Sequence, residues 1–422
     1  MRKRMIAAAF ACIVLFSLAG CGKTADGFVP SENKNASHHM VLALREGTYA
    51  DVIEGCLADF EKKHDVAIDV YELSEDGLHS AVADDAANDE GAYDLCMVDG
   101  SWMQEYTAEN VLTKLNDYGY TLDDDIIPAT TEICYRDGDT YLAPYYGNVT
   151  VLLYNKSILE RAGYAAEGVL SVGDMQRICN FAKKTHNLGF MYRGDSENNI
   201  VVDFLPVLLA CGGWVVDEDN HPTVDTPEFH RAMESYMALI DTGKPASRDE
   251  LVIAVANNAA AMAIGWPGWY TPERNSTADY IAIPVKGTAD GKTYNTSVYG
   301  VWTIGVPANS MNKGLAVELL SYLMDPKVQL ATVEKGGVPC RYSCLRDPEV
   351  LEKFPQYEAV RQALENGVYR PIMEEWTDFY TILGAHMREI INGEKNVDKG
   401  LKEAQEELEA LCGSKQNLAD EQ

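Results

Sequence analysis

The stretch that constrains the fold most runs from Tyr141 to Tyr164 and reads YLAPYYGNVTVLLYNKSILERAGY. Short runs of bulky residues precede Pro144 and follow Gly147. Aromatic and β-branched side chains are typical of strands, while the proline and the glycine mark a break between them. After Asn155 the apolar spacing becomes helical. The stretch therefore predicts strand, break, strand and helix, with polar aromatic residues exposed at the break.

The start of the folded region predicts a parallel sheet. Apolar strands are expected at Val41–Leu44 and Val66–Tyr71, with a helix between them. This order implies a right-handed crossover between parallel strands. A further buried strand, Tyr93–Asp99, is followed at once by Ser101 and Trp102. Ligands of open α/β sheets bind beyond the carboxyl ends of the strands, so both residues become candidates for a binding site. Packing of Trp102 at a helix start is the alternative.

The first residues of the chain are typical of an export signal. Arg2 to Arg4 precede an apolar run, which ends in Leu18-Ala19-Gly20-Cys21. That run is too short to span a membrane, but a positive region, an apolar core and small residues before a cleavage point characterise a secretory signal. The final four residues resemble the lipobox of bacterial lipoproteins. This resemblance implies that Cys21 is lipidated, whereas an ordinary secretory signal with a chance cysteine is the alternative.

The net charge disfavours several classes of ligand, and the positions of the cysteines predict how these residues are used. The chain has 422 residues, enough for two hydrophobic cores, and a formal net charge of −30. Such a surface disfavours nucleic acid, anionic lipid and polyanionic ligands. Most of the ten cysteines lie in apolar runs and are expected to be buried, although Cys340 and Cys344 are close enough in sequence for a local disulfide. No motif indicates a cofactor, a metal or a nucleotide.

The stretch around Pro144 resembles the extracellular solute-binding proteins of ABC importers, in the branch that includes maltodextrin-binding protein. The shared motifs are Pro-Tyr-Tyr at 144–146, Tyr-Asn-Lys at 154–156, Ala-Gly at 162–163 and Gly-Gly-Val-Pro-Cys-Arg at 336–341. Their order and spacing, more than any single motif, indicate the family. The resemblance covers nearly everything from Met40 to Cys412.

This resemblance implies a two-lobe, hinge-linked α/β fold, in which each lobe is a mostly parallel sheet flanked by helices. Crossings between the lobes are expected near Tyr146–Val151, Val298–Thr303 and Pro339–Cys344. The expected division is a signal peptide at 1–20, a lipidated flexible tether at 21–39, a first lobe from 40–147 and 302–340, a second lobe from 148–301 and 341–412, and a disordered tail at 413–422.

The expected ligand is a neutral or weakly charged carbohydrate, most simply an oligosaccharide. Aromatic faces suit the apolar faces of a sugar ring, and polar side chains suit its hydroxyls. Core packing is the alternative for each aromatic residue. Trp266 and Trp269 flank Pro267-Gly268, so one indole is expected in the cleft and the other in the core. The expected ligand-binding residues are Arg45, Glu46, Ser101, Trp102, Tyr145, Tyr146, Asn148, Trp214, Trp266, Trp269, Tyr299, Arg341, Trp376 and Tyr380.

The resemblance also implies partners. A monomer, held at the extracytoplasmic face of the membrane only by its lipid, would deliver its ligand to the permease subunits of an ABC transporter. A binding protein for a polyamine or peptide is the first alternative. A glycan hydrolase is the second, because a pair of carboxylates suffices for that chemistry and acids abound. No catalytic residue is assigned.

Overall fold

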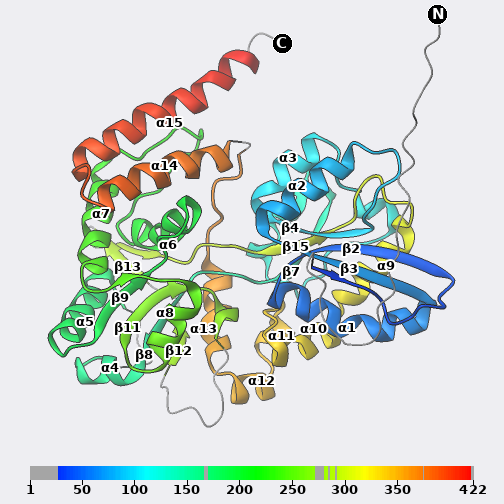
Figure 1. Ribbon diagram of the computed structural model, residues 1–422, viewed down its shortest axis with the longest axis horizontal. Helices are drawn as coiled ribbons and strands as arrows, with labels where there is room; N and C mark the ends of the chain where they lie inside the picture. Colours follow the sequence, from blue (N-terminus) through cyan, green and yellow to red (C-terminus); the bar gives the residue numbers. More distant parts are fainter. Residues whose placement is uncertain are drawn as a thin grey trace, which may run out of the picture.

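Two lobes lie side by side and are joined by chain segments that pass between them (Figure 1). The computed structural model describes residues 27–165, 170–270, 280–283, 286–289, 292–373 and 375–419, and within 280–295 and 414–419 it describes only the backbone. Cys21 and the signal peptide lie outside the described residues. In the described part of the chain, no helix combines the length and apolar character needed to cross a membrane.

The first lobe is built on a six-stranded sheet. Its strands, in spatial order, are β1 (Phe28–Val29), β3 (Val66–Leu73), β2 (His38–Arg45), β4 (Leu95–Asp99), β15 (Trp302–Gly305) and β7 (Leu142–Tyr146). Its helices are α1 (Thr48–His64), α2 (Glu75–Ala86), α3 (Met103–Ala108), α9 (Lys313–Leu323), α10 (Pro326–Thr332), α11 (Tyr342–Leu345), α12 (Pro348–Lys353) and α13 (Gln356–Asn366). A short hairpin of β5 (Tyr135–Arg136) and β6 (Asp139–Thr140) precedes β7.

The second lobe has a five-stranded sheet in the order β10 (Lys244–Pro245), β9 (Leu188–Tyr192), β11 (Ala260–Gly265), β8 (Val151–Asn155) and β12 (Tyr280–Ile283). Its helices are α4 (Lys156–Arg161), α5 (Val172–Lys184), α6 (Glu197–Ala210), α7 (Pro227–Ile240), α8 (Arg248–Ala256), α14 (Trp376–Ile391) and α15 (Val397–Ala419). A separate hairpin pairs β13 (Lys286–Ala289) with β14 (Lys292–Asn295).

The two-lobe α/β fold is therefore confirmed, and its sheets mix two kinds of pairing. In the first lobe β2 pairs in parallel with β3 and β4, as the strand–helix–strand pattern predicts. In contrast, β15 runs antiparallel to both β4 and β7. The chain enters β15 directly from the other lobe, so no crossover helix is present to return it in the parallel sense. The sheet of the second lobe is mixed in the same way, because β11 pairs in parallel with β9 and antiparallel with β8.

Three segments pass between the lobes. The first, 147–150, links β7 to β8, and the second, 296–301, leads into β15. They run side by side, because Val149 forms an antiparallel bridge with Tyr299. The third is 367–373, where Val368 bridges Val298 in parallel. It does not lie near Pro339–Cys344, since α11, α12 and α13 pack on the core of the first lobe before the chain crosses. The domain boundaries stay a prediction, and this packing favours moving 341–366 to the first lobe.

Both ends of the folded region are more ordered than the sequence suggested. Part of the expected tether forms β1, which extends the first sheet antiparallel to β3, and Phe28 packs on Tyr71 with ring centroids 4.9 Å apart. Ser31 N–H donates to Asp69 over 2.7 Å. At the other end α15 continues to Ala419, through the first part of the expected tail. Backbone pairing and helix continuation, which composition alone does not reveal, account for both differences.

Candidate functional site

A cleft between the lobes contains two adjoining cavities, of about 430 and about 490 Å³. We call them the first and the second cavity. Side chains from both lobes line each of them, so the site exists only where the lobes meet. Six residues line both cavities and form the junction between them: Arg45, Tyr49, Asn148, Arg248, Trp266 and Trp269.

The two tryptophans reach the cleft because of a turn that follows β11. This strand consists of small and apolar buried residues, and Pro267 then opens a short 3-10 turn that ends at Trp269. The turn is tight: a Cβ on Gly265 would lie 2.7 Å from the Trp269 ring. Both indoles line both cavities and are only partly buried. The structure thus does not place one indole in the cleft and the other in the core. The Arg193 guanidinium lies 5.1 Å from the Trp269 ring centroid, a cation–π distance.

Two tyrosines and an asparagine line the other side of the first cavity. The Tyr49 ring lies 4.7 Å from that of Tyr146 and 5.6 Å from that of Trp302, measured between centroids. The Tyr146 hydroxyl donates to the Gly336 carbonyl over 2.7 Å, which fixes its ring. Asn148 Nδ2 donates to the Tyr49 hydroxyl over 3.1 Å. Asn148 is 3% exposed, and its Oδ1 accepts no hydrogen bond from any residue that the structure describes.

The second cavity is strongly charged. Arg370 donates to both carboxylate oxygens of Asp99, over 2.8 and 2.9 Å. Burial opposes the charge on Arg370, but Asp99 and Glu75 outweigh it and raise the pKa of the guanidinium. Burial first, and the neighbouring Asp99 carboxylate second, raise the pKa of Glu75. Arg193 forms a buried ion pair with Asp203 of α6.

Several expected binding residues lie behind the cleft and support it. Trp102 is 8% exposed and packs edge-on against Trp302, with centroids 5.5 Å apart. Ser101 Oγ donates to Asp99 over 2.7 Å and so orients the partner of Arg370. Tyr299 is buried, and its hydroxyl donates to the Leu364 carbonyl.

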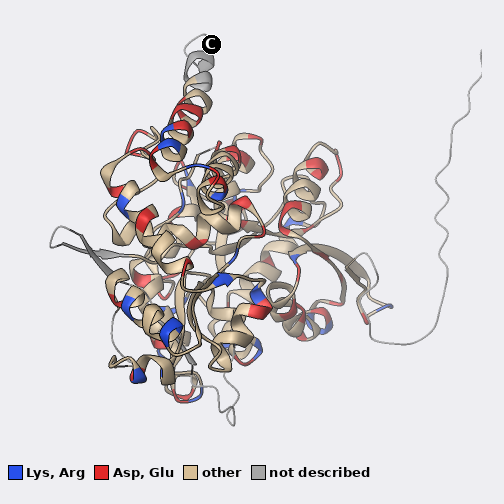
Figure 2. Cartoon of the chain, turned by 60° about the vertical axis from the view of Figure 1, so that its left-hand side comes forward, with Lys and Arg blue, Asp and Glu red and all other residues tan. Residues whose placement is uncertain are grey.

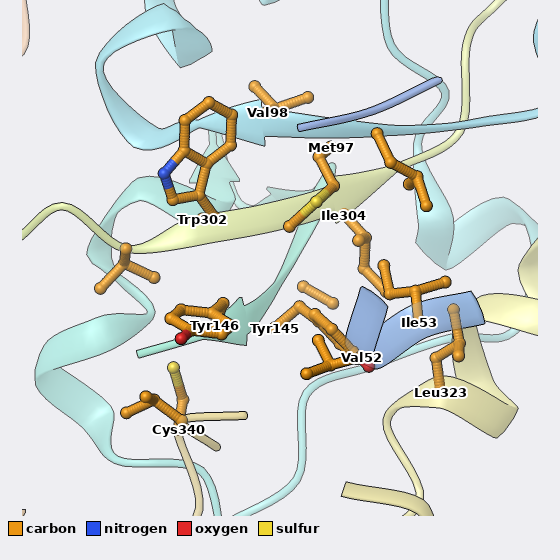
Figure 3. Close-up of a cluster of buried hydrophobic side chains, with 14 of the residues drawn as sticks. Val52, Ile53, Met97, Val98, Tyr145, Tyr146, Trp302, Ile304, Leu323 and Cys340 are labelled. Atoms are coloured by element: carbon orange, nitrogen blue, oxygen red, sulfur yellow. The ribbon is translucent and has the colours of Figure 1, made fainter. Parts of the chain in front are cut away.

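Tyr145 points away from the cleft. Figure 3 shows it beside Val52 and Ile53 of α1, whereas Tyr146, the next residue in the strand, lies beside Cys340. Tyr145 is 3% exposed. Alternation along β7 explains the difference, because successive side chains of a strand face opposite sides of the sheet.

Three further candidates line neither cavity. Arg341 is 2% exposed and donates to both oxygens of Asp123, each over 2.7 Å, so it anchors the 123–125 turn. Trp376 is buried in the second core and stacks on Phe379. Trp214 packs against the same core. The physical reason is the same in each case: the residue already has a structural partner on its own lobe.

The remaining candidates do line the cavities, and the structure adds others. Arg45 ends β2 and Glu46 follows it at the first cavity, and Tyr380 of α14 lines the second. Sequence reasoning missed Tyr49, Glu75, Arg193, Arg248 and Arg370. A signal existed for the first two: both lie in the first turn of a helix that follows a parallel strand, beyond its carboxyl end.

The eight cysteines of the described residues are all free. Cys340 and Cys344 are both buried, so the local disulfide left open by the sequence is absent from the structure. Burial raises the pKa of Cys340 to about 12 and that of Cys344 to about 11. These thiols therefore pack as small apolar groups.

Comparisons with known proteins agree with this geometry. A family model described as bacterial extracellular solute-binding protein matches residues 56–359. A probable amino-acid ABC transporter periplasmic-binding protein of Sinorhizobium fredii is 22% identical over 394 residues, which cover 89% of this chain and 90% of the relative. The diacetylchitobiose binding protein of Streptomyces coelicolor is 22% identical over 393 residues, with the same coverage of 89% and 90%.

Solved structures share the fold. The maltose-bound T. maritima MalE3 protein superposes with a TM-score of 0.79 at 20% identity, over 89% of this chain and 100% of that one. An ABC transporter solute-binding protein of Agrobacterium radiobacter, in complex with ribitol, has a TM-score of 0.78 at 22% identity, over 89% and 99% of the two chains. At this level of identity the likeness shows the two-lobe architecture.

Proposed function

Because the chain belongs to the bacterial extracellular solute-binding protein family, we propose that it captures a saccharide between its lobes and delivers it to the permease of an ABC transporter. Members of this family are substrate-binding proteins of transporters and not enzymes. This protein is likewise a binding protein and not an enzyme. The glycan hydrolase alternative is therefore set aside.

One observation carries the saccharide assignment: two partly exposed indoles share a cleft with hydrogen-bonding side chains. Trp266 and Trp269 offer flat apolar faces, which suit the C–H faces of a sugar ring. Asn148 offers a hydroxyl donor an oxygen that accepts no hydrogen bond from the described residues. Two adjoining cavities suit a neutral or weakly charged ligand of more than one ring. The named ligands of the relatives, diacetylchitobiose, maltose and ribitol, support the same class.

A thermal-shift screen, followed by calorimetry, tests this assignment. Any ligand that binds the native state alone raises the melting temperature. Neutral oligosaccharides should produce the shift, and peptides should not. If no saccharide shifts the melting temperature while spermidine or a peptide does, the saccharide assignment fails.

A small cationic or zwitterionic solute is the second candidate. The carboxylates of the second cavity, Glu75 and Asp76 among them, favour it. The Sinorhizobium fredii relative, described as a probable amino-acid transporter component, points the same way. The same screen separates the two candidates.

Attachment to the membrane belongs to the same proposal. The lipobox-like Leu18-Ala19-Gly20-Cys21 implies a diacylglycerol on Cys21, which would leave a monomeric protein held at the extracytoplasmic face. Cys21→Ser should then release the protein into the medium or the periplasmic fraction. A Cys21→Ser protein that fractionates with the membrane as wild type does would contradict the anchor.

A further inference from the structure

The carboxylates that line the second cavity are not all balanced by its arginines. The acidic residues that line it are Glu75, Asp76, Asp99, Asp195 and Glu197, and the basic residues are Arg45, Arg193, Arg248 and Arg370. The number of charges alone decides nothing, because ion pairs within the wall cancel one another. The pairing of each charge is what matters.

Every arginine of this cavity already holds a carboxylate. Arg370 pairs with Asp99 over 2.8 Å, and Arg193 is paired with Asp203 inside the second lobe. Arg45 pairs with Glu46 over 3.1 Å, and Arg248 pairs with Asp249 over 2.8 Å. An anionic group on a ligand would therefore have to compete with a carboxylate at each arginine.

Glu75 and Asp76 have no such partner among the residues that the structure describes. They occupy the first turn of α2, where Ser74 caps the helix by accepting from the Gly77 N–H over 3.1 Å. The positive partial charge at the N-terminus of α2 stabilises two acidic side chains there, but it does not neutralise either of them. Arg370 and Arg45 lower the pKa of Glu75 to a lesser extent than burial and Asp99 raise it, but neither arginine forms an ion pair with Glu75 or Asp76 among the described residues. A cation on a ligand would therefore find two carboxylates without an ion-pair partner at this wall of the cavity.

Two tyrosines, Tyr49 and Tyr380 of the second lobe, line the same cavity as Glu75 and Asp76. Burial first, and the charges of these two carboxylates second, raise the pKa of Tyr380. Burial, and to a smaller extent the charge of Glu75, also raises the pKa of Tyr49. Carboxylates combined with aromatic faces are what an ammonium group selects, because each stabilises positive charge.

An independent observation points to a hydrogen-bond donor on the ligand. Asn148 is 3% exposed and lines both cavities, yet its Oδ1 accepts no hydrogen bond from the described residues. A buried acceptor without a partner is costly, so a donor from the ligand is expected to satisfy it. A sugar hydroxyl is such a donor. The ligand thus needs a hydroxyl for Asn148 and a cation for α2.

We infer that the captured saccharide carries a protonated amine, which binds between Glu75 and Asp76 of the first lobe and Tyr380 of the second. The inference rests on the proposed saccharide-binding function and specifies its substrate class. Since the amine contacts both lobes, it would also favour their closure. An N-acetylated sugar of the same shape has no charge and would lose these contacts.

Calorimetry with matched disaccharides tests the amine. The probes are the β-1,4-linked disaccharide of glucosamine, its di-N-acetylated form, and cellobiose. We expect the free amine to bind at least about tenfold more tightly than the acetylated form, which corresponds to about 1.4 kcal/mol. The preference should shrink at high salt, because the added ions screen charge pairs. Equal or tighter binding of the acetylated form or of cellobiose overturns the inference.

Substitutions in α2 test which side chains cause the preference for the protonated amine. Glu75→Gln and Asp76→Asn keep the shape of the side chains and should each reduce the preference for the amine over cellobiose severalfold. Asp84→Asn, on the exposed face of the same helix, is the matched control and should leave the preference intact. Melting temperatures equal to that of wild type show that the variants are folded. A preference that survives in the Glu75→Gln/Asp76→Asn double variant overturns the inference.

The outcomes also separate this inference from the proposed function. If cellobiose or the acetylated sugar binds and the amine gives no advantage, the inference fails while saccharide capture stands. If no saccharide binds, both fail. Spermidine binding more tightly than every saccharide would overturn the inference as well, because the amine would then belong to a different class of ligand.

Discussion

Three of the five tryptophans that were expected to bind ligand lie in three different structural settings. Trp266 is partly exposed in the cleft, Trp102 is buried behind it, and Trp214 packs on the second core away from both cavities. Trp266→Ala should therefore weaken binding of the ligand found in the screen by about 1–3 kcal/mol, with a small change in melting temperature. Calorimetry and thermal melts measure the two effects.

Trp102→Ala should show the reverse pattern. Removal of a buried indole that packs on Trp302 should lower the free energy of unfolding by about 3–5 kcal/mol. Trp214→Ala, outside the cleft, should leave affinity unchanged. If Trp266→Ala keeps wild-type affinity while Trp214→Ala loses it, the cleft has been placed on the wrong side of the second lobe.

The ion pair between Arg341 and Asp123 makes a prediction about pH. The Arg341 guanidinium donates to Asp123 and, despite partial burial, holds the pKa of this carboxyl below its usual value. A lowered folded-state pKa means that the stabilisation is fully present above the unfolded pKa of about 4 and is lost as pH falls through the lower, folded-state pKa.

Asp123→Asn should consequently destabilise the protein at pH 7 by about 1–2 kcal/mol, a figure reduced because Asp123 is half exposed. The gap between wild type and variant should close as the pH falls below 4, where wild type loses its own carboxylate. Thermal melts between pH 7 and pH 3 measure the gap. A gap that stays constant over this range would mean that charge is not the cause.

Sequence motifs predicted some of the residues that line the cavities. Residues whose position depends on contacts with distant parts of the sequence were not predicted. Asn148, Trp266 and Tyr380 all line the cavities, as the resemblance implied. Arg370 was missed because it meets Asp99 only through the third crossing, across 271 residues of sequence. Arg341 was misplaced for a similar reason, since its partner Asp123 lies 218 residues away. Periodicity identifies which residues are buried or exposed, but it does not show which distant segments meet.

At the scale of elements, the second crossing supports the wall of the cleft. Gly300 lies in 296–301, and a Cβ at this position would lie 2.8 Å from the Trp266 ring and 3.4 Å from Asn148 Nδ2. Gly300→Ala should displace the indole and weaken ligand binding severalfold, with little effect on melting temperature. Calorimetry on the variant measures the loss.

The matched control for this change is Gly314→Ala in α9. A Cβ there would meet nothing within 4 Å, so alanine should be neutral or stabilise the helix by about 0.5–1 kcal/mol. Its ligand affinity should equal that of wild type. If Gly300→Ala binds as wild type does, the position of Trp266 is not what the crossing determines.

The elements themselves followed the sequence closely where periodicity is strong. The expected apolar strands at Val41–Leu44 and Val66–Tyr71 lie within β2 and β3. The third crossing could not be located in this way, because α11–α13 have amphipathic patterns that fit either lobe. Only their packing on the first core decides between the two.

At the scale of the whole molecule, acidic residues are spread over both lobes (Figure 2). The net charge of −30 keeps such a protein soluble and makes polyanions poor ligands. The three crossing segments lie together between the lobes, so a small change in their backbone angles would move one lobe relative to the other. Hinge closure around a ligand is a known motion of such two-lobe binding proteins.

Small-angle X-ray scattering tests capture between the lobes most directly. The purified protein is measured alone and with a saturating concentration of a saccharide that calorimetry shows to bind tightly. Closure of the lobes on the ligand predicts a smaller radius of gyration in the bound state, and Trp266→Ala at the same ligand concentration should show a smaller change. A scattering curve that does not change when wild type is fully bound would contradict capture by closure of this cleft.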